Sequence, residues 1–384
     1  MAIYHYKGLF IVNKERLLEE FFELIRIDSE TKDERAIADV LTKKMEALGF
    51  DVFEDDSAER SGHGAGNLIA SMKGTVPTAD PIYFTCHMDT VVPGLGIKPE
   101  LRDDGYVYSD GTTILGADDK AGIAALFEMM RTVKESNVPH GDIQFVITAG
   151  EESGLAGAKE MDPTLITAKY GYAVDSDGKV GGIVTSAPYQ AKLETIIYGK
   201  TAHAGVAPEK GVSAINIAAK SISAMSLGRI DSETTANIGR FHGGQATNIV
   251  CDKVTILAEA RSINPEKLVE QTEHMVSTFE RISGQMGGQA ETEVHQMYPG
   301  FRFEEKDEVV QTAIKAISNI GRTHELLTSG GGSDGNVFNG ADIPTVTLSV
   351  GYEEIHTTKE RMPVEELNKL TELLIEIVNV TATK

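Results

Sequence analysis

The chain has 384 residues, which exceeds the length of one compact core and predicts two domains, or one large domain with an insertion. Hydrophobic residues make up 41% and charged residues 24%, which excludes a disordered chain, a collagen-like fibre and a membrane-spanning bundle. Asp and Glu outnumber Lys and Arg by 58 to 36, and the resulting formal charge of −22 argues against nucleic acid and membrane surfaces as partners.

Cysteine content and the N-terminal segment both indicate a reducing compartment. Cys86 and Cys251 are the two cysteines, and the single disulfide they could form is too little to staple a chain of this length. Residues 1–22 mix charged with apolar side chains and lack the continuous apolar stretch of a secretory signal. We therefore expect a cytoplasmic protein.

Helix and strand patterns alternate along the first half of the chain. Apolar residues recur at helical spacing in residues 13–25 and 34–48, which predicts two amphipathic helices. Residues 117–135 predict a third helix, with Asp118 and Asp119 in its first turn, where carboxylates suit the helix dipole. Short apolar runs that break into polar residues predict buried strands at residues 81–86, 142–148 and 170–174. This succession is typical of a mostly parallel sheet covered by helices.

A different pattern begins at Pro188. Residues 189–300 predict elements in the order strand, helix, strand, strand, helix, strand, which is the element sequence of a ferredoxin-like unit. After this segment, the chain returns to an alternation of helix, strand and helix at residues 309–320, 344–350 and 364–380.

The two patterns together predict the fold class and the domain organisation. We expect an α/β domain with a mostly parallel sheet flanked by helices, formed by residues 1–187 and 299–384. We expect a smaller α+β domain of residues 188–298 to be inserted in its middle.

Polar residues directly follow the predicted strands, at the edge where open α/β sheets bind ligands. These residues are His87, Asp89, Glu151, Glu152, Asp175 and, after the late strand, His356, and they are joined by Asp118 and Asp119 at the start of a predicted helix. Carboxylates and imidazoles are ligands for divalent cations, and this many carboxylates at one edge would repel one another without a cation. The sequence therefore predicts a metal centre, and a pair of divalent cations would remove the repulsion.

Six motifs, in order along nearly the whole chain, resemble the M20 family of co-catalytic zinc metallopeptidases. They are HMDTV at His87, GADDKAG at Gly116, GEESGLAG at Gly150, VDSD at Val174, GKTAHAGVAPEKGVSAI at Gly199 and IHTTKE at Ile355. Within the family they look most like peptidase T and its shorter relatives, which implies removal of the N-terminal residue of tripeptides. HAGVAPEKG also resembles the glutamate-carboxypeptidase branch, so a carboxypeptidase or an N-acyl amino acid deacylase is the alternative.

By position, the resemblance implies a ligand set for two metal ions. Asp118 would bridge the two ions, His87 and Asp175 would complete one site, and Glu152 and His356 the other. The expected ions are two Zn²⁺, although Co²⁺ and Mn²⁺ are compatible with the same ligands.

The resemblance also implies roles for residues around the metals. Glu151 would be the general base, and Asp89 would hold the His87 imidazole in one tautomer. His203 of the inserted domain would stabilise the oxyanion. The short peptide substrate would be held by Asn248, Arg261, Gly331 and Gly332. The inserted domain would act as a lid and as the surface of a homodimer.

Three other hypotheses are weighed against this one. G-x-S-x-G around Ser333, followed by Asp342 and His356, has the residue order of a serine α/β-hydrolase, but a nucleophile elbow needs a strand before it and a helix after it, and the flanking residues predict neither. A dinucleotide-binding fold fails because no strand is predicted to lead into Gly330. A non-catalytic metal-binding protein would have no need of a free base such as Glu151.

Overall fold

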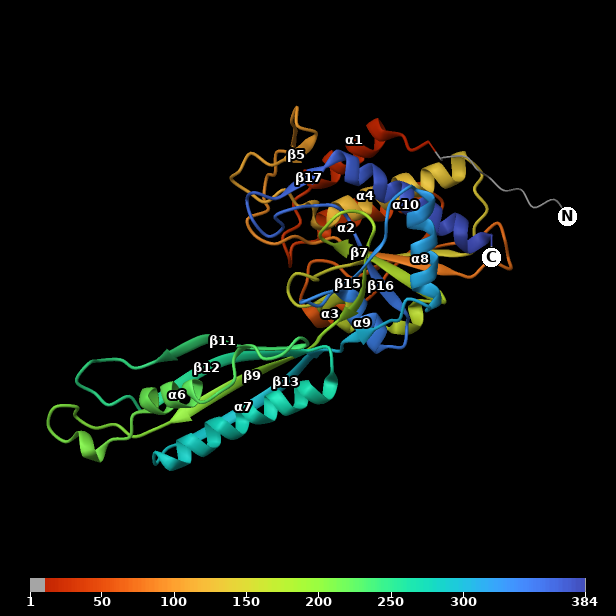
Figure 1. Ribbon diagram of the computed structural model, residues 1–384. Coiled ribbons are helices and arrows are strands. Elements are labelled where there is room, and N and C mark those ends of the chain that lie inside the picture. Colours follow the sequence, from red (N-terminus) through yellow and green to blue (C-terminus); the bar gives the residue numbers. More distant parts are fainter. Residues whose placement is uncertain (1–10, 384) are drawn as a thin grey trace. The chain divides into compact units, whose positions relative to one another are not determined.

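The computed structural model describes residues 11–383, which divide into two compact units (Figure 1). The first unit comprises Met1–Thr185, Phe303–Thr328 and Ser333–Lys384, and the second comprises Ser186–Arg302 and Ser329–Gly332. The short glycine-rich stretch Ser329–Gly332 thus groups with the second unit, whereas the sequence analysis places it in the first domain. The prediction that residues 1–22 lack a secretory signal falls partly on residues 1–10, which lie outside the described residues.

A mixed sheet forms the centre of the first unit. Its strands are β1 (Asp51–Glu54), β2 (Leu68–Met72), β3 (Ile82–His87), β6 (Ile143–Thr148), β7 (Tyr170–Ser176), β8 (Gly182–Ala187), β15 (Glu325–Thr328) and β16 (Thr345–Ser349). They lie in the order β1-β2-β6-β3-β7-β16-β8, with β15 paired to β8. Strand β3 runs parallel to β6 and β7, and β16 runs parallel to β7. The predicted fold class is confirmed, because the central strands are parallel and their carboxyl ends meet at one edge.

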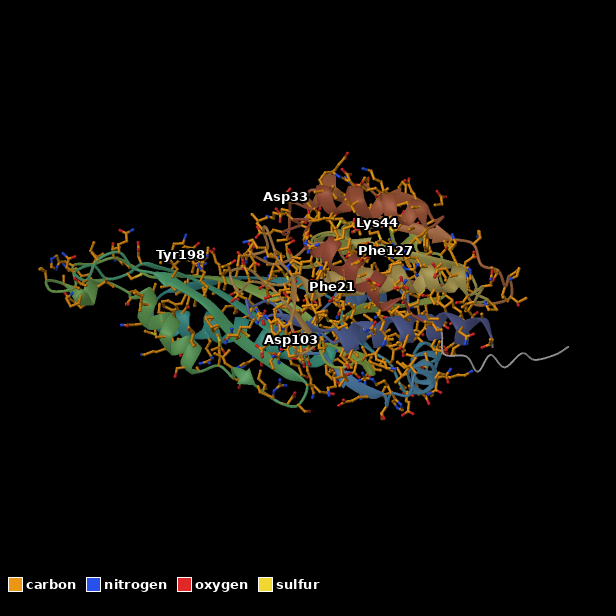
Figure 2. All side chains as sticks on the ribbon, turned by 90° about the horizontal axis from the view of Figure 1, so that it is seen from above. Phe21, Asp33, Lys44, Asp103, Phe127 and Tyr198 are labelled. Atoms are coloured by element: carbon orange, nitrogen blue, oxygen red, sulfur yellow. The ribbon has the colours of Figure 1, made fainter. Side chains whose placement is uncertain are left out.

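Helices cover both faces of this sheet. They are α1 (Lys14–Ile25), α2 (Arg35–Ala47), α3 (Ser57–Ser61), α4 (Ala117–Glu135), α5 (Ala156–Glu160), η1 (Pro163–Leu165), α8 (Glu308–Asn319), α9 (Asp334–Gly340) and α10 (Val364–Ala382). Side chains alternate along β3, so Phe84 joins one buried cluster that also contains Phe21 of α1 and Phe127 of α4. Figure 2 labels Phe21 and Phe127. Its neighbour Tyr83 joins another cluster with Phe338 of α9. A separate small sheet has the order β17-β5-β4 and consists of β4 (Glu100–Leu101), β5 (Tyr106–Tyr108) and β17 (Arg361–Pro363).

The second unit is an antiparallel sheet with two helices. Its elements are β9 (Tyr189–Tyr198), η2 (Pro208–Lys210), α6 (Ala214–Ser223), β10 (Gly228–Arg229), β11 (Thr234–Gly243), β12 (Lys253–Ser262), α7 (Pro265–Gln285), β13 (Gln289–Tyr298) and β14 (Phe301–Arg302). The strand order is β10-β11-β12-β9-β13. Helix α7 begins where the Asn264 side chain accepts hydrogen bonds from the backbone N–H groups of Glu266 and Lys267, and Pro265 needs no such partner. None of the described helices is long and apolar enough to cross a membrane.

Candidate metal centre

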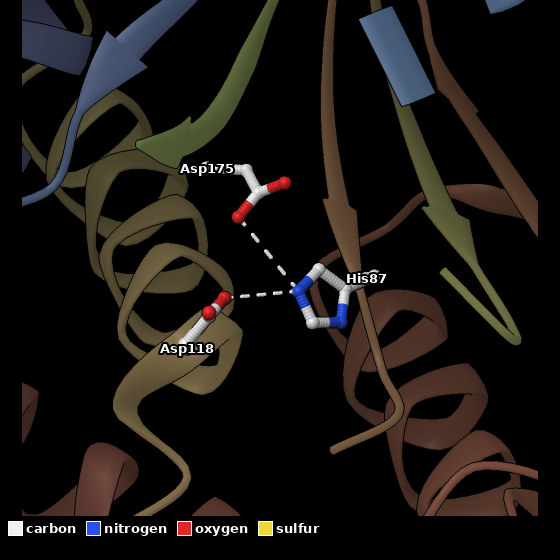
Figure 3. A group of neighbouring side chains, drawn as sticks. All are labelled: His87, Asp118 and Asp175. Carbon is white, nitrogen blue, oxygen red and sulfur yellow. Dashed lines mark hydrogen bonds and ion pairs between the residues drawn. The ribbon is translucent and has the colours of Figure 1, made fainter. Parts of the chain in front are cut away.

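The Asp118 carboxylate lies between two imidazoles in the first unit. Its Oδ1 is 3.0 Å from His87 Nε2, and its Oδ2 is 3.2 Å from His356 Nε2. Asp175 Oδ1 lies 3.7 Å from His87 Nε2 (Figure 3). Glu152 Oε1 lies 2.9 Å from His356 Nε2. The five side chains thus form two groups that share Asp118, and the ligand atoms within each group lie within 4.8 Å of one another.

The backbone before α4 places Asp118 away from the regular helix. Gly116 adopts a φ of +72°, a left-handed conformation that glycine takes without a steric penalty. Asp118 and Asp119 have non-helical backbone angles, so the regular part of α4 begins only after them. Both carboxylates thus lie in the first turn of α4 as expected, but their backbone is not the regular helix that the periodicity indicates.

The physical reason is a buried carboxylate that sequence reasoning missed. Glu360 accepts hydrogen bonds from the backbone N–H groups of Leu115 and Gly116, both at 2.7 Å, and of Asp118 at 3.0 Å. These bonds hold the chain in a tight loop in front of the helix. Burial raises the pKa of Glu360 to about 7. In the sequence, Glu360 is the last residue of IHTTKE. Residue spacing alone does not show that its carboxylate binds a distant part of the backbone.

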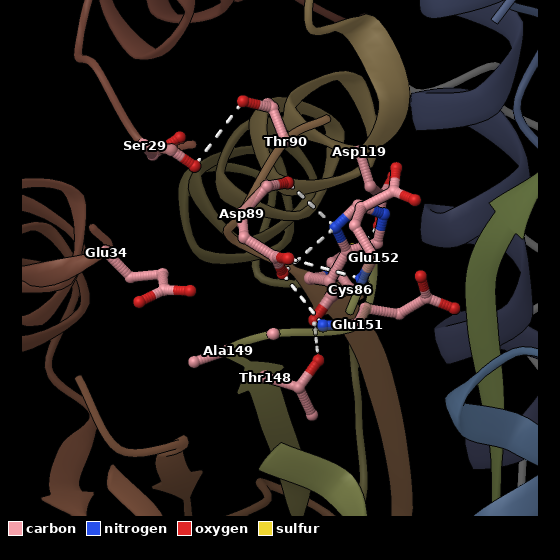
Figure 4. A network of polar contacts seen from close by, with 12 residues as sticks. Ser29, Glu34, Cys86, Asp89, Thr90, Asp119, Thr148, Ala149, Glu151 and Glu152 are labelled. Carbon is pink, nitrogen blue, oxygen red and sulfur yellow. Dashed lines mark hydrogen bonds and ion pairs between the residues drawn. The ribbon is translucent and has the colours of Figure 1, made fainter. Parts of the chain in front are cut away.

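Asp89 fixes both the first histidine and the glutamate pair (Figure 4). His87 Nδ1 contacts the main-chain oxygen of Asp89 at 2.9 Å and its carboxylate Oδ1 at 3.5 Å. Both neighbours are acceptors, so Nδ1 carries a proton, which leaves Nε2 as the atom that would bind a cation. Asp89 also accepts hydrogen bonds from Glu151 N at 3.0 Å and Glu152 N at 3.2 Å. The predicted contact between Asp89 and His87 is present, with the main-chain oxygen as the nearer acceptor.

The loop that carries Glu151 and Glu152 is held closely by its neighbours. Gly150 has a φ of +66°, and a Cβ at this position would overlap the His63 ring. His63 Nε2 contacts Ser153 Oγ at 2.6 Å on the other side of the glutamate pair. The loop therefore presents its two glutamates in one fixed arrangement.

Crowding of negative charge shifts the ionisation of the cluster. Burial raises the pKa of Glu151 well above its ordinary value, and the Asp175 carboxylate raises it further. Burial likewise raises the pKa of Asp175, followed by the effect of Asp118. Contacts with Asp118 and Glu152 raise the pKa of His356 to about 10. Without cations the cluster retains protons, so its oxygen and nitrogen donors fit divalent metal ions, which would take the place of those protons.

A second buried carboxylate near the cluster, Asp334, was also missed. It contacts Thr148 Oγ1 at the end of β6, and its other oxygen has no hydrogen-bond partner among residues 11–383. Burial raises the pKa of Asp334 to about 6. The residue follows Ser333 in SGGGSDG, where the G-x-S-x-G pattern gives no indication that Asp334 is buried. Asp119 is also buried and accepts a hydrogen bond from His87 N at 3.2 Å, which agrees with a hydrogen-bonding role.

The local structure around Ser333 differs from the expectation. Strand β15 precedes this residue and helix α9 follows it, so both elements that flank a nucleophile elbow are present, and the argument from their absence is wrong. The contacts of Ser333 argue against a nucleophile. The Ser333 N–H donates to Asn336 Oδ1 at 3.0 Å, and the Ser333 hydroxyl lies 3.5 Å from Thr347 Oγ1. The described partners of Ser333 include no base that would activate the hydroxyl.

His203, Asn248 and Arg261 lie in the second unit, at two ends of one strand. The backbone N–H of Ala204 donates to Asn248 O at 2.9 Å, so His203 and Asn248 lie on neighbouring loops beyond the start of β12. Arg261 lies near the opposite end of β12, eight residues after Lys253, or about 26 Å along the strand at about 3.3 Å per residue. The structure therefore does not bring His203 and Arg261 of one chain together.

The predicted substrate-binding groups of this unit have partners within it. Arg261 contacts the Glu259 carboxylate through Nε at 3.0 Å and Nη2 at 3.2 Å, and its Nη1 donates to Gly330 O at 3.0 Å. A Cβ on Gly332 would meet the Tyr298 ring at 2.5 Å, so packing alone requires glycine there. Gly331 is open by comparison, with its nearest neighbour 3.9 Å from an added Cβ.

Comparison with known proteins places this geometry in a family context. The model of peptidase family M20/M25/M40 matches residues 83–380. The aminopeptidase PepT structure from Bacillus cereus ATCC 10987 is 62% identical, covers 98% of this chain and 100% of its own, and superposes with a TM-score of 0.94. A tripeptidase structure from Staphylococcus aureus subsp. aureus Mu50 is 52% identical with a TM-score of 0.96, covering 98% of this chain and 100% of its own. The protein YqjE of Bacillus subtilis (strain 168) is 61% identical over 97% of this chain and 100% of its own.

Proposed function

Because the chain belongs to peptidase family M20/M25/M40, we propose that it hydrolyses short peptides at the Asp118-centred cluster with two divalent cations, with Zn²⁺ as the favoured ion. One observation carries the proposal: the two oxygens of Asp118 face two different imidazoles, each of which has a second carboxylate beside it. Asp118 would bridge the cations, with His87 and Asp175 on one side and Glu152 and His356 on the other.

The residues around the cluster divide the chemical work. When bound, the cations supply Lewis-acid activation of a water molecule and of the scissile carbonyl. Glu151 is the general base, which removes a proton from the attacking water and delivers it to the leaving amine. Burial and the Asp175 carboxylate raise the pKa of Glu151, which favours its taking up a proton. Asp89 positions Glu151 and Glu152 by accepting both of their backbone N–H groups.

The substrate is proposed to be a tripeptide that loses its N-terminal residue. This part rests on the similarity to solved structures of an aminopeptidase PepT and a tripeptidase. The test is a panel of di-, tri- and tetrapeptides with free ends, acetylated N-termini or amidated C-termini. We expect tripeptides with a free N-terminus to be cleaved fastest, with release of the first residue. Fast cleavage of acetylated peptides at the last bond would instead identify a carboxypeptidase, and release of acyl groups from acyl amino acids a deacylase.

Arg261 is proposed to bind the carboxylate of the substrate, while its contacts to Glu259 and Gly330 hold it in place. Arg261→Ala is expected to raise KM for peptides with a free C-terminus and to leave kcat nearly unchanged, because ground state and transition state lose the same contact. Steady-state kinetics on matched free and amidated tripeptides would measure this. Arg261→Lys is the control that keeps the charge without the two-pronged contact. An equal change in KM for both peptides would contradict the assignment.

A homodimer is proposed because the proposed substrate-binding residues of the second unit do not lie close together within one chain. Arg261 lies about 26 Å along β12 from Lys253, and His203 lies beside the loop before Lys253, whereas an extended tripeptide spans at most about 11 Å. A second copy of the chain would supply the missing contact, and the second unit is the proposed dimer surface. The cytoplasmic location remains a prediction.

A further inference from the structure

Three residues of one segment contact three different parts of the cluster. Tyr352, His356 and Glu360 follow one another at intervals of four residues between β16 and β17. The Tyr352 hydroxyl donates to Asp175 Oδ1 at 3.0 Å, and His356 Nε2 lies between Asp118 and Glu152. Glu360 accepts from the backbone of the loop that carries Asp118. The segment therefore touches ligands of both proposed cation sites.

The Glu360 contact depends on the chemistry of a carboxylate. Its Oε2 accepts two N–H groups, from Leu115 and Gly116, and its Oε1 accepts the third, from Asp118. The side chain is 1% exposed, and no ion pair of Glu360 is found within the described part of the chain. A glutamine would have to turn its NH₂ group toward at least one of these N–H donors, because only one of its two terminal atoms is an acceptor. The variant would therefore lose at least one hydrogen bond to the loop that sets the position of Asp118.

Hydrogen bonds within the segment from Tyr352 to Glu360 hold it as one unit, so a movement at one end is transmitted to the other. Glu353 and Arg361 exchange backbone hydrogen bonds of 2.9 and 3.0 Å across it. The Thr357 hydroxyl donates to Glu354 O at 2.7 Å, and Glu360 N donates to Thr357 O at 3.1 Å. His356 itself has a φ of +61°, a conformation that a non-glycine residue keeps only where its surroundings impose it. A shift of Glu360 would therefore move His356 as well as Asp118.

We propose that Glu360 is a positioning residue that assembles both cation sites as one unit, through the Asp118 loop and through the His356 segment. This inference rests on the proposed two-cation function. It predicts that loss of the Glu360 contact weakens both sites together, whereas loss of a ligand such as His356 weakens one site first.

The test is cation binding to the full-length chain after removal of metal by chelation. Co²⁺ would be added stepwise, with calorimetry for the dissociation constants and visible absorption for the ligand geometry at each equivalent. The wild type is expected to bind two equivalents. Glu360→Gln is expected to weaken both steps by about 10- to 100-fold, the usual effect of losing a group that orients metal ligands. His356→Ala is expected to weaken one step far more than the other.

Glu353→Gln is the matched control, because Glu353 lies in the same segment and pairs with Arg361 but contacts none of the proposed ligands. It should leave both Co²⁺ constants and both spectra unchanged. Wild-type binding by Glu360→Gln, or weakening of one step alone, would overturn the inference. If circular dichroism shows that the glutamine variant is unfolded, Glu360→Asp replaces it in the same Co²⁺ titration, because aspartate keeps both acceptor oxygens on a shorter side chain. Weakening of both steps would support the inference, and wild-type binding or weakening of one step alone would overturn it. A wild type that binds no second cation would instead contradict the proposed function.

Discussion

Glu151→Gln is expected to bind both cations normally and to lower kcat by about 10² to 10⁴, the usual contribution of general acid–base catalysis. The amide keeps the size of the side chain and the backbone bond from Glu151 N to Asp89, so the loop should stay in place. It has no carboxylate to remove a proton from water. Metal content by mass spectrometry and kcat on a tripeptide would be measured on the same preparation.

The adjacent residue provides the control for this prediction. Glu152 lies 2.9 Å from His356 Nε2, so Glu152→Gln should weaken one cation site before it affects chemistry in the fully loaded enzyme. Both variants replace a carboxyl group of the same loop by an amide of the same size. If Glu151→Gln loses metal while Glu152→Gln binds it normally, the two roles are reversed.

His203→Ala is expected to leave the cation content unchanged and to lower kcat by about 10² to 10³, the scale of removing one oxyanion donor. The structure gives His203 the correct tautomer for this role. Its Nδ1 accepts a hydrogen bond from Gly205 N at 3.2 Å, so Nε2 of the neutral ring carries the hydrogen and is a donor. The ring is exposed on the second unit, where a substrate oxygen would meet it without displacing a partner. An unchanged kcat would show that the second unit adds no oxyanion donor at this position.

Mixing two inactive variants would show whether His203 acts on the partner's substrate. Glu151→Gln and His203→Ala chains each lack one of the two groups, but a mixed dimer has one site that contains both. After subunit exchange at equal concentrations, about a quarter of the wild-type activity is expected if the histidine acts across a two-fold dimer. No gain over the separate variants, with mixed dimers demonstrated, would place His203 in its own chain's site.

The elements and the proposed ligands could be predicted because their signals are local. The range of α4 could be predicted because its apolar face repeats over many turns, although its regular part begins only after Asp119. The strands β3, β6 and β7 end beside polar residues, and parallel strands bring such residues to the same edge. The proximity of His87 and Asp175 follows from that rule.

What could not be predicted depends on contacts between residues far apart in the chain. Glu360 binds Leu115 at a separation of 245 positions, and Asp334 contacts Thr148 at a separation of 186, so neither has a local pattern. The same loop contact changes the backbone at Asp118 and Asp119, which helical periodicity alone places in a regular turn. The wide separation of His203 from Arg261 depends on the hydrogen bond from Ala204 N to Asn248 O, which joins two loops that are distant in the sequence.

The most direct test of the two-cation proposal is a stepwise reconstitution. The full-length chain would be stripped of metal by exhaustive chelation, and Zn²⁺ would then be added in fractions of an equivalent while tripeptide hydrolysis is followed. We predict negligible activity in the stripped protein, because the described cluster holds no group that activates water unaided, and a rise that levels off at two equivalents. Full activity in the metal-free protein, abolished by a serine-directed fluorophosphonate, would contradict the proposal and point to Ser333.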